Sequence, residues 1–155
     1  PGEDGVMRRP PRPTGQALLT RRLLWRIVFV SLLMVAGTFG IYSHATALGL
    51  SVETARTMAV NTIVVMEIFY LFSVRYVHGS SLTWQGVLGT PAVLSAVALV
   101  VAAQLLFTYA PFMHQIFDSR PVALADGLLI ISIGLALLIV VEAEKWIARR
   151  MEKRA

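Results

Sequence analysis

The chain of 155 residues is 56% hydrophobic and only 15% charged, and its formal net charge is +5. The apolar share is too high and the charged share too low for an ordinary soluble domain, so the composition indicates a membrane protein. The absence of cysteine excludes disulfides, thiolate metal sites and cysteine nucleophiles.

The first segment, residues 1–20, interleaves prolines and arginines, among them Arg8, Arg9, Pro10, Pro11, Arg12 and Pro13. Proline breaks helices and the stretch has few apolar side chains, so it can form neither a regular helix nor a core of its own. We expect an extended cytoplasmic lead. Because the chain begins with Pro1 and not with an initiator methionine, we also expect a processed product or a piece of something longer.

Apolar stretches of about 20 residues follow the lead, and each is long enough as a helix to cross a hydrocarbon core about 30 Å thick. The four stretches are Leu23 to Tyr42, Thr57 to Val74, Thr90 to Tyr109 and Val122 to Val141. They predict an all-α integral membrane protein, with residues 21–155 forming a bundle of four transmembrane helices. The first stretch also resembles a signal peptide, but its apolar run is too long for one and three more spans follow.

Lysine and arginine are distributed unequally across this topology, with twelve on the side of the termini and only Arg56 and Arg120 on the other. The positive-inside rule therefore places both termini in the cytoplasm. The same one-sided distribution argues against a nucleic-acid partner. Most acidic residues are expected in water: Glu3, Asp4, Glu142, Glu144 and Glu152 inside, and Glu53, Asp118 and Asp126 outside or at the outer interface.

Local signals support the spans. Pro91 suits the first turn of the third helix, where its missing N–H costs nothing, and Pro111 and Pro121 punctuate the outer loop. Aromatic residues near the span ends are expected to anchor them at the headgroups: Trp25, Tyr42, Tyr76, Trp84, Tyr109 and Trp146. Close helix packing is predicted at three pairs of small residues: Gly37 with Gly40, Ala92 with Ala96, and Ala98 with Ala102.

Glu67 is the acidic residue that is not expected to lie in water, because it is roughly 12 to 15 Å from either end of its predicted helix. A carboxyl group at that depth costs on the order of 2.5 to 3.5 kcal/mol. Two interpretations remain open. Either Glu67 is protonated and hydrogen-bonded to another helix, or it is a cation ligand or a proton acceptor on a transport path. In the second interpretation, as ligand or as acceptor, its side chain faces the bundle interior. One carboxylate cannot complete a Ca²⁺ or Mg²⁺ site, so other ligands must come from elsewhere.

Three polar residues are candidates to support Glu67. Tyr70 lies one turn further along the same face, where it either orients the carboxylate or simply packs. Asn61 lies about 120° away round the helix, which favours an interhelical hydrogen bond over a ligand role. Gln104 is the strongly polar residue inside the third span and a candidate partner.

The sequence shows no pattern for a zinc site, a catalytic triad or a phosphate-binding loop. The three histidines, His44, His78 and His114, fall on different loops and sides of the membrane and make no zinc set. Neither a Ser-His-Asp arrangement nor a glycine-rich phosphate loop occurs. We therefore expect no catalytic centre and no cofactor site within this chain.

Several stretches, in order along nearly the whole chain, carry a family resemblance. Met7-Arg8-Arg9-Pro10-Pro11-Arg12 is similar to the loop before the seventh transmembrane helix of P-type cation-transporting ATPases of the calcium-pump type, and Thr57-Met58-Ala59 followed by Glu67 is similar to their eighth helix. Tyr109-Ala110-Pro111 and Ile116-Phe117 resemble the loop between the ninth and tenth helices. Glu142 and Lys145-Trp146-Ile147-Ala148-Arg149 resemble the end of the tenth.

This resemblance implies that the chain holds helices seven to ten of such a pump. It implies that Glu67 contributes one ligand to a cation site, and that the loop from Arg8 to Arg12 meets the cytoplasmic domains of the parent. The parent would use ATP and Mg²⁺ and transport Ca²⁺ or another cation. The family's phosphorylated aspartate in Asp-Lys-Thr-Gly-Thr and its nucleotide domain are absent from this sequence.

The short cysteine-free loop between the first two spans departs from the animal calcium pump and points to a bacterial member, hence to a bacterial inner membrane. Two other classes of function remain open from the residues alone. One is a self-contained four-helix exporter in which Glu67 couples transport to protons, and the other is a membrane anchor that transports nothing.

Overall fold

The computed structural model describes residues 21–74 and 91–152, and these two ranges contain helices and no strands. The helices are α1 (Arg21–Ala47), α2 (Val52–Val74), α4 (Pro91–Tyr109), α5 (Pro111–Phe117) and α6 (Leu124–Glu152). The lead of residues 1–20, with the arginines and prolines from Arg8 to Arg12, lies outside the described residues. So do the predicted anchors Tyr76 and Trp84.

Four helices, α1, α2, α4 and α6, are long and apolar enough to cross a membrane, which confirms the predicted spans. The third span begins at Pro91 as expected. Three spans are longer than predicted, since α1 continues to Ala47, α2 already begins at Val52, and α6 continues to Glu152. The outer loop also contains a helix that the sequence analysis missed, because Pro111 begins the short α5 instead of interrupting a loop.

The turn between α1 and α2 is explained by its sequence. Gly49 adopts a positive φ of 75°, and the amides of Gly49 and Leu50 donate to the carbonyls of Thr46 and Ala45. This pattern of bonds closes a helix C-terminus on a left-handed glycine. Ser51 then caps α2 by accepting a hydrogen bond from the Thr54 amide at 3.2 Å. The chain therefore reverses direction within four residues, and α1 and α2 run antiparallel.

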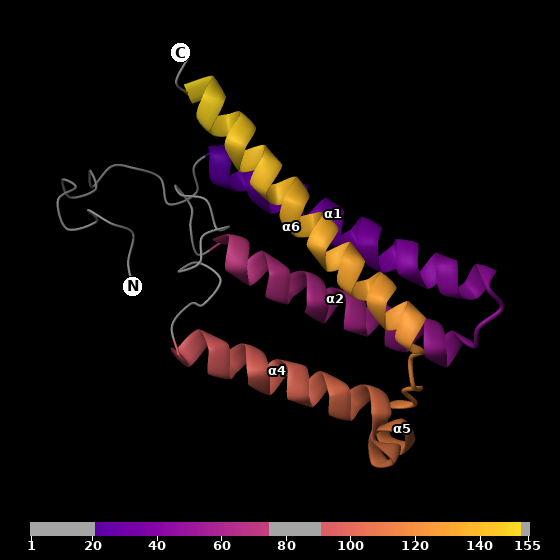
Figure 1. The fold of residues 1–155 in the computed structure, drawn as a ribbon. Helices are drawn as coiled ribbons and strands as arrows, with labels where there is room; N and C mark the ends of the chain where they lie inside the picture. The colour runs from indigo at the N-terminus through magenta and orange to yellow at the C-terminus, as the bar shows by residue number, and fades with distance from the viewer. Residues whose placement is uncertain (1–20, 75–90, 153–155) are drawn as a thin grey trace.

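Helix α2 lies at the centre of the molecule, packed mainly against α6 and α1, while α4 lies along its other side with fewer contacts (Figure 1). Figure 1 also shows that α1 begins and α6 ends at the same end of the bundle, which we call the terminal end. The opposite end, which carries the α1–α2 turn and α5, is called the α5 end. Helix α2 runs from the α5 end to the terminal end.

The core consists of two apolar clusters along the α1–α2–α6 contact. The cluster nearer the α5 end contains Ile41, Ala45, Ala55, Met58, Val122 and Ile130, and the cluster nearer the terminal end contains Val30, Met66, Leu137 and Val141. Helix α2 contributes Met58 and Met66, which are almost completely buried. The side of α2 that carries these methionines is therefore its inner face.

Small residues bring these helices together, although only at some of the predicted positions. A Cβ on Gly37 of α1 would lie 2.8 Å from the Met66 sulfur, whereas Gly40 has nothing within 4 Å. Gly134 of α6 also lies against α2, where a Cβ would come within 2.7 Å of Val65 and 2.6 Å of Phe69. The alanines expected to pack α4, namely Ala92, Ala96, Ala98 and Ala102, are exposed in this chain. The close-packing prediction is thus right for Gly37 and wrong for those four alanines within this bundle.

Candidate functional site

Glu67 lies on the outer side of α2. As a cation ligand or a proton acceptor, Glu67 is predicted to face the interior of the bundle, but within these four helices its side chain is exposed. The reason is geometric: Met58 and Glu67 are nine residues apart, which places them on opposite sides of a helix that turns 100° per residue. With Met58 buried against α1 and α6, Glu67 has to point away from both.

Glu67 shares this outer face with apolar side chains at helical spacing. Val60, Ile63, Leu71 and Val74 are 40%, 39%, 37% and 37% exposed. We call these four residues together with Glu67 the outer stripe of α2. Within the described part of the chain, no hydrogen bond or ion pair joins the Glu67 carboxylate to another residue. A single carboxylate therefore stands in the middle of an apolar, uncovered helix face.

The depth of Glu67 also becomes clearer, because α2 begins five residues before the predicted span. At 1.5 Å of rise per residue, Glu67 lies about 22 Å from Val52 and about 10 Å from Val74. The carboxylate is thus nearer to the terminal end than to the α5 end, but still about two helical turns inside α2.

Tyr70 lies beside the outer stripe and packs inward. It is partly buried against the cluster of Val30, Met66, Leu137 and Val141. Among the described residues no hydrogen bond joins the Tyr70 hydroxyl to Glu67, so the contacts of Tyr70 in this structure are packing contacts.

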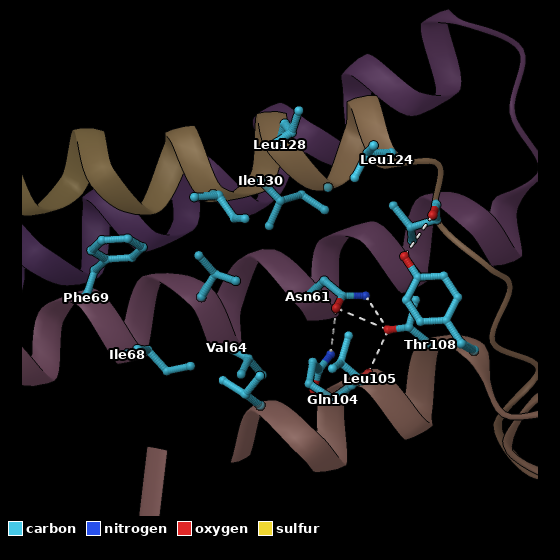
Figure 2. A pocket seen from close by; sticks show the side chains of 16 residues that line it. Asn61, Val64, Ile68, Phe69, Gln104, Leu105, Thr108, Leu124, Leu128 and Ile130 are labelled. Atoms are coloured by element: carbon cyan, nitrogen blue, oxygen red, sulfur yellow. Dashed lines mark hydrogen bonds between the residues drawn. The ribbon is translucent and has the colours of Figure 1, made fainter. Parts of the chain in front are cut away.

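Asn61 and Gln104 meet each other between α2 and α4, at the α5 end of the interface (Figure 2). The Gln104 side-chain amide donates to Asn61 Oδ1 at 3.2 Å, and Asn61 Nδ2 donates to the Thr57 carbonyl at 2.9 Å and to Thr108 Oγ1 at 3.0 Å. The Thr108 hydroxyl in turn donates to the Gln104 carbonyl at 2.8 Å. We call Asn61, Gln104 and Thr108 the amide cluster. It joins α2 to α4 and lies on a different face of α2 from Glu67.

An apolar groove of about 480 Å³ extends from the amide cluster between α2, α4 and α6. Figure 2 shows Phe69 on the side of α2 toward α6, and Val64 and Ile68 on the side toward α4, while α6 contributes Leu128 and Ile130 to the lining. Its polar groups, those of the amide cluster and the Tyr109 hydroxyl that donates to the Val122 carbonyl at 2.9 Å, already have partners within the chain. The groove therefore offers apolar surface and no evident ligand for an ion.

The α5 end is fastened by ionic contacts at the surface. Asp118 ends α5 in the left-handed conformation, with φ of 54°, and its carboxylate lies 3.2 Å from Arg56 and 2.9 Å from Arg120. The Arg120 amide also donates to Thr57 Oγ1 at 3.0 Å. These side chains are about half exposed, so the ion pairs contribute only about 0 to 1 kcal/mol each. They connect the segment after α5 to the start of α2.

At the terminal end, a buried ionic group joins α6 to the last turn of α2. Lys145 is only 2% exposed; its ammonium group donates to the Ser73 carbonyl and, at 2.7 Å, to Glu142 Oε1. The Ser73 hydroxyl donates to the same Glu142 oxygen at 2.9 Å. We call Ser73, Glu142 and Lys145 the terminal cluster.

Glu142 is not where the sequence predicts it, because the prediction places it in water and the structure leaves it only 9% exposed. Glu142 lies beyond the predicted end of the fourth span, and so do Glu144 and Lys145, which made all three look solvated. The available signal was the Glu-x-x-Lys spacing, which puts both charges on one face of a helix. A second pair confirms that this region is packed, since Arg26 of α1 lies 3.4 Å from Glu144.

The donors present on the described residues do not add up to a metal centre, because no three His, Asp or Glu side chains come together there. A carboxylate supplies at most two oxygens, whereas Ca²⁺ takes 6 to 8 and Mg²⁺ about six. Glu67 could therefore supply part of a cation site and would need oxygen ligands from other helices.

Comparison with known proteins identifies the family. Residues 1–147 match the family described as "Cation transporting ATPase, C-terminus". The chain is 35% identical over 150 residues to "Probable cation-transporting ATPase F" of Mycobacterium tuberculosis, covering 96% of this chain and 16% of that protein. It is 30% identical over 122 residues to "Cation-transporting ATPase pma1" of Synechocystis, covering 76% of this chain and 14% of that protein.

A eukaryotic relative matches over almost the same range. The chain is 26% identical over 153 residues to the human "Calcium-transporting ATPase type 2C member 1", covering 99% of this chain and 16% of that protein. The chain thus spans about a sixth of the length of these relatives. The expected resemblance is confirmed: the chain belongs to the cation-transporting ATPase family and corresponds to the C-terminal membrane region of its members.

Proposed function

We propose that this chain is part of an ATP-driven cation pump, and that Glu67 supplies one carboxylate to the site of the transported cation. The observation that carries the proposal is the outer stripe of α2, where one carboxylate stands among apolar residues well inside a membrane span. The remaining helices of the chain then brace α2 on its other faces.

The outer stripe requires a cover, and the nature of the cover decides the role of Glu67. Against lipid, a carboxyl group inside the span costs on the order of 2.5 to 3.5 kcal/mol. Against other helices of a pump, the four apolar residues pack and the carboxylate can meet a cation or a polar partner. Because the chain spans only about a sixth of its relatives, the proposal assigns the cover to the preceding helices of the parent protein.

The rest of the pump follows from the same assignment. The parent supplies the other oxygen ligands, the phosphorylated aspartate and the domain that binds ATP and Mg²⁺. The lead from Arg8 to Arg12 meets its cytoplasmic domains. The excess of lysine and arginine favours a cytoplasmic terminal end, and the bacterial relatives favour a bacterial inner membrane.

The decisive experiment is Glu67→Gln in the full-length pump that carries this segment, with ATP hydrolysis measured against Ca²⁺ concentration. Ca²⁺ is the first probe because one relative is named a calcium-transporting ATPase, and Mn²⁺, Mg²⁺, Na⁺ and K⁺ are titrated in parallel. We expect the activating cation to be needed at about tenfold or higher concentration, since even groups that only orient a metal ligand contribute on the order of 10- to 100-fold in affinity.

Glu53→Gln is the matched control, because it removes a carboxylate from the first turn of the same helix, far from Glu67. We expect it to leave the cation dependence unchanged. If Glu67→Gln also leaves the dependence on every cation unchanged, Glu67 is structural and this proposal is wrong.

The two other classes of function give different results. A self-contained exporter would move its substrate with only these four helices, without ATP hydrolysis by a parent. A membrane anchor would be stabilised by Glu67→Leu, which completes the apolar outer stripe, and transport would be unaffected.

A further inference from the structure

The last turn of α2 is connected to α6 by more than apolar packing. Ser73 contributes both its carbonyl and its hydroxyl to the terminal cluster, and it is completely buried. Glu142 and Lys145 reach it from one face of α6, three residues apart. Contacts of this kind depend on direction and distance, so they fix where Ser73 lies both along and around the axis of α2.

Lys145 donates to the carbonyl of Ser73, one residue before the end of α2 at Val74. A positive charge at the C-terminal end of a helix is favourable because it opposes the negative end of the helix dipole. Glu142 balances the charge of Lys145 inside the protein. The terminal cluster thus joins this end of α2 to α6 by charge as well as by hydrogen bonds.

Two glycine contacts fix the same helix on either side of Glu67. Gly37 of α1 admits the Met66 side chain, and Gly134 of α6 lies against Val65 and Phe69. These contacts involve the residues immediately before Glu67 and two positions after it. Ser73 follows Glu67 by six residues, about 9 Å along the axis. The stretch from Val65 to Ser73 is therefore held at both ends by α6, with Glu67 between the two points.

We propose that Glu142 and Lys145 are positioning residues for the cation site, because they set the height and rotation of α2 and so the place of the Glu67 carboxylate. The inference rests on the proposed function of Glu67 and deepens it. Neither residue touches the cation. They act through Ser73 and the helix between Ser73 and Glu67.

A purely structural role would not need this chemistry. Buried ion pairs can often be replaced by apolar side chains without loss of stability, so holding α2 against α6 is a task for which leucine or methionine would suffice. Apolar side chains permit sliding and repacking, whereas a hydrogen-bonded charge selects one register. The pair of Arg26 and Glu144 offers a comparison, since it lies at the same level of α6 but joins α6 to α1.

The test is a double-mutant cycle in the full-length pump, with Lys145→Met, Glu67→Gln and the two combined. The readouts are the Ca²⁺ concentration for half-maximal ATP hydrolysis, the maximal rate, and the temperature at which half the activity is lost. We expect Lys145→Met to raise the half-maximal Ca²⁺ concentration about tenfold, in the range of groups that orient a metal ligand, and Lys145→Arg to restore most of it. In the Glu67→Gln background, Lys145→Met should have no further effect.

Glu142→Gln keeps the size and one acceptor of the side chain, so it serves if Lys145→Met fails to fold. We expect it to raise the half-maximal Ca²⁺ concentration by a few-fold, and the matched control Glu144→Gln to leave it unchanged. The inference is overturned if Lys145→Met and Glu142→Gln lower only thermal stability, or if the effects of Lys145→Met and Glu67→Gln multiply independently. A lack of effect of Glu67→Gln alone overturns the proposed function instead.

Discussion

Asn61 illustrates what individual residues do in this bundle. It makes hydrogen bonds with Gln104 and Thr108 on the facing helix, and these are the polar contacts that hold α4 to α2. Interhelical hydrogen bonds of this kind contribute about 0.6 kcal/mol on average and at most about 1.7. The low value arises because polar groups in a membrane find partners in the unfolded state too.

We predict that Asn61→Ala lowers the free energy of unfolding of the detergent-solubilised pump by about 1 kcal/mol, because it removes the bonds that bridge α2 and α4. Unfolding in increasing SDS, followed by circular dichroism, measures this. Ser95→Ala is the control, since the Ser95 hydroxyl bonds the Ala92 carbonyl of its own helix. Equal loss in both variants would mean that the amide cluster does not dock α4.

Lys145, at the terminal end, belongs to a buried charge pair, whose loss costs more free energy than the loss of the hydrogen bonds of Asn61. Removing one partner of a buried, hydrogen-bonded charge pair leaves the other uncompensated, which typically costs about 3 to 5 kcal/mol.

The polar residues inside the spans and those of the terminal cluster differ in how far the sequence could predict their places in the structure. Glu67 and Asn61 are polar residues inside apolar runs, which marks them in one dimension. The burial of Glu142 and Lys145 depends on Ser73, about 70 residues away, which no local pattern reveals.

At the scale of the helices, length and apolar content were enough to predict α1, α2, α4 and α6. Their ends were less predictable, because capping extends them beyond the apolar runs. Ser51 starts α2 before Thr57, and the hydrogen bonds around Gly49 carry α1 past Tyr42. The direction of Glu67 was also not predictable, because periodicity gives the faces of α2 but not which helix covers each.

Helix packing makes its own prediction at Gly134. Adding a methyl group there forces Val65 and Phe69 to move, and overpacking of this kind costs about 1 to 3 kcal/mol. We therefore expect Gly134→Ala to lower the temperature of half-inactivation of the purified pump. Gly127→Ala, on the same helix with nothing within 4 Å, should leave that temperature unchanged or raise it slightly. If both variants behave alike, close approach of α6 to α2 is not what limits packing.

For the whole molecule, the arrangement of the helices places the start of α1 and the end of α6 together (Figure 1). The distribution of lysine and arginine then predicts that this terminal end is cytoplasmic. We expect green fluorescent protein fused after the last residue to be fluorescent in cells. Alkaline phosphatase inserted between Asp118 and Pro121 should be active. The reverse pair of results would invert the orientation.

The outer stripe of α2 connects these scales, since the proposed cation site depends on a single residue, on one helix face and on the helices proposed to cover that face. Equilibrium binding of ⁴⁵Ca²⁺ to the purified full-length pump in the absence of ATP tests this most directly, with wild type, Glu67→Gln and the control Glu53→Gln compared at equal protein. The account predicts that Glu67→Gln alone loses high-affinity bound Ca²⁺. Unchanged amount and affinity of bound Ca²⁺ in Glu67→Gln, in a pump whose wild type binds Ca²⁺, would contradict it.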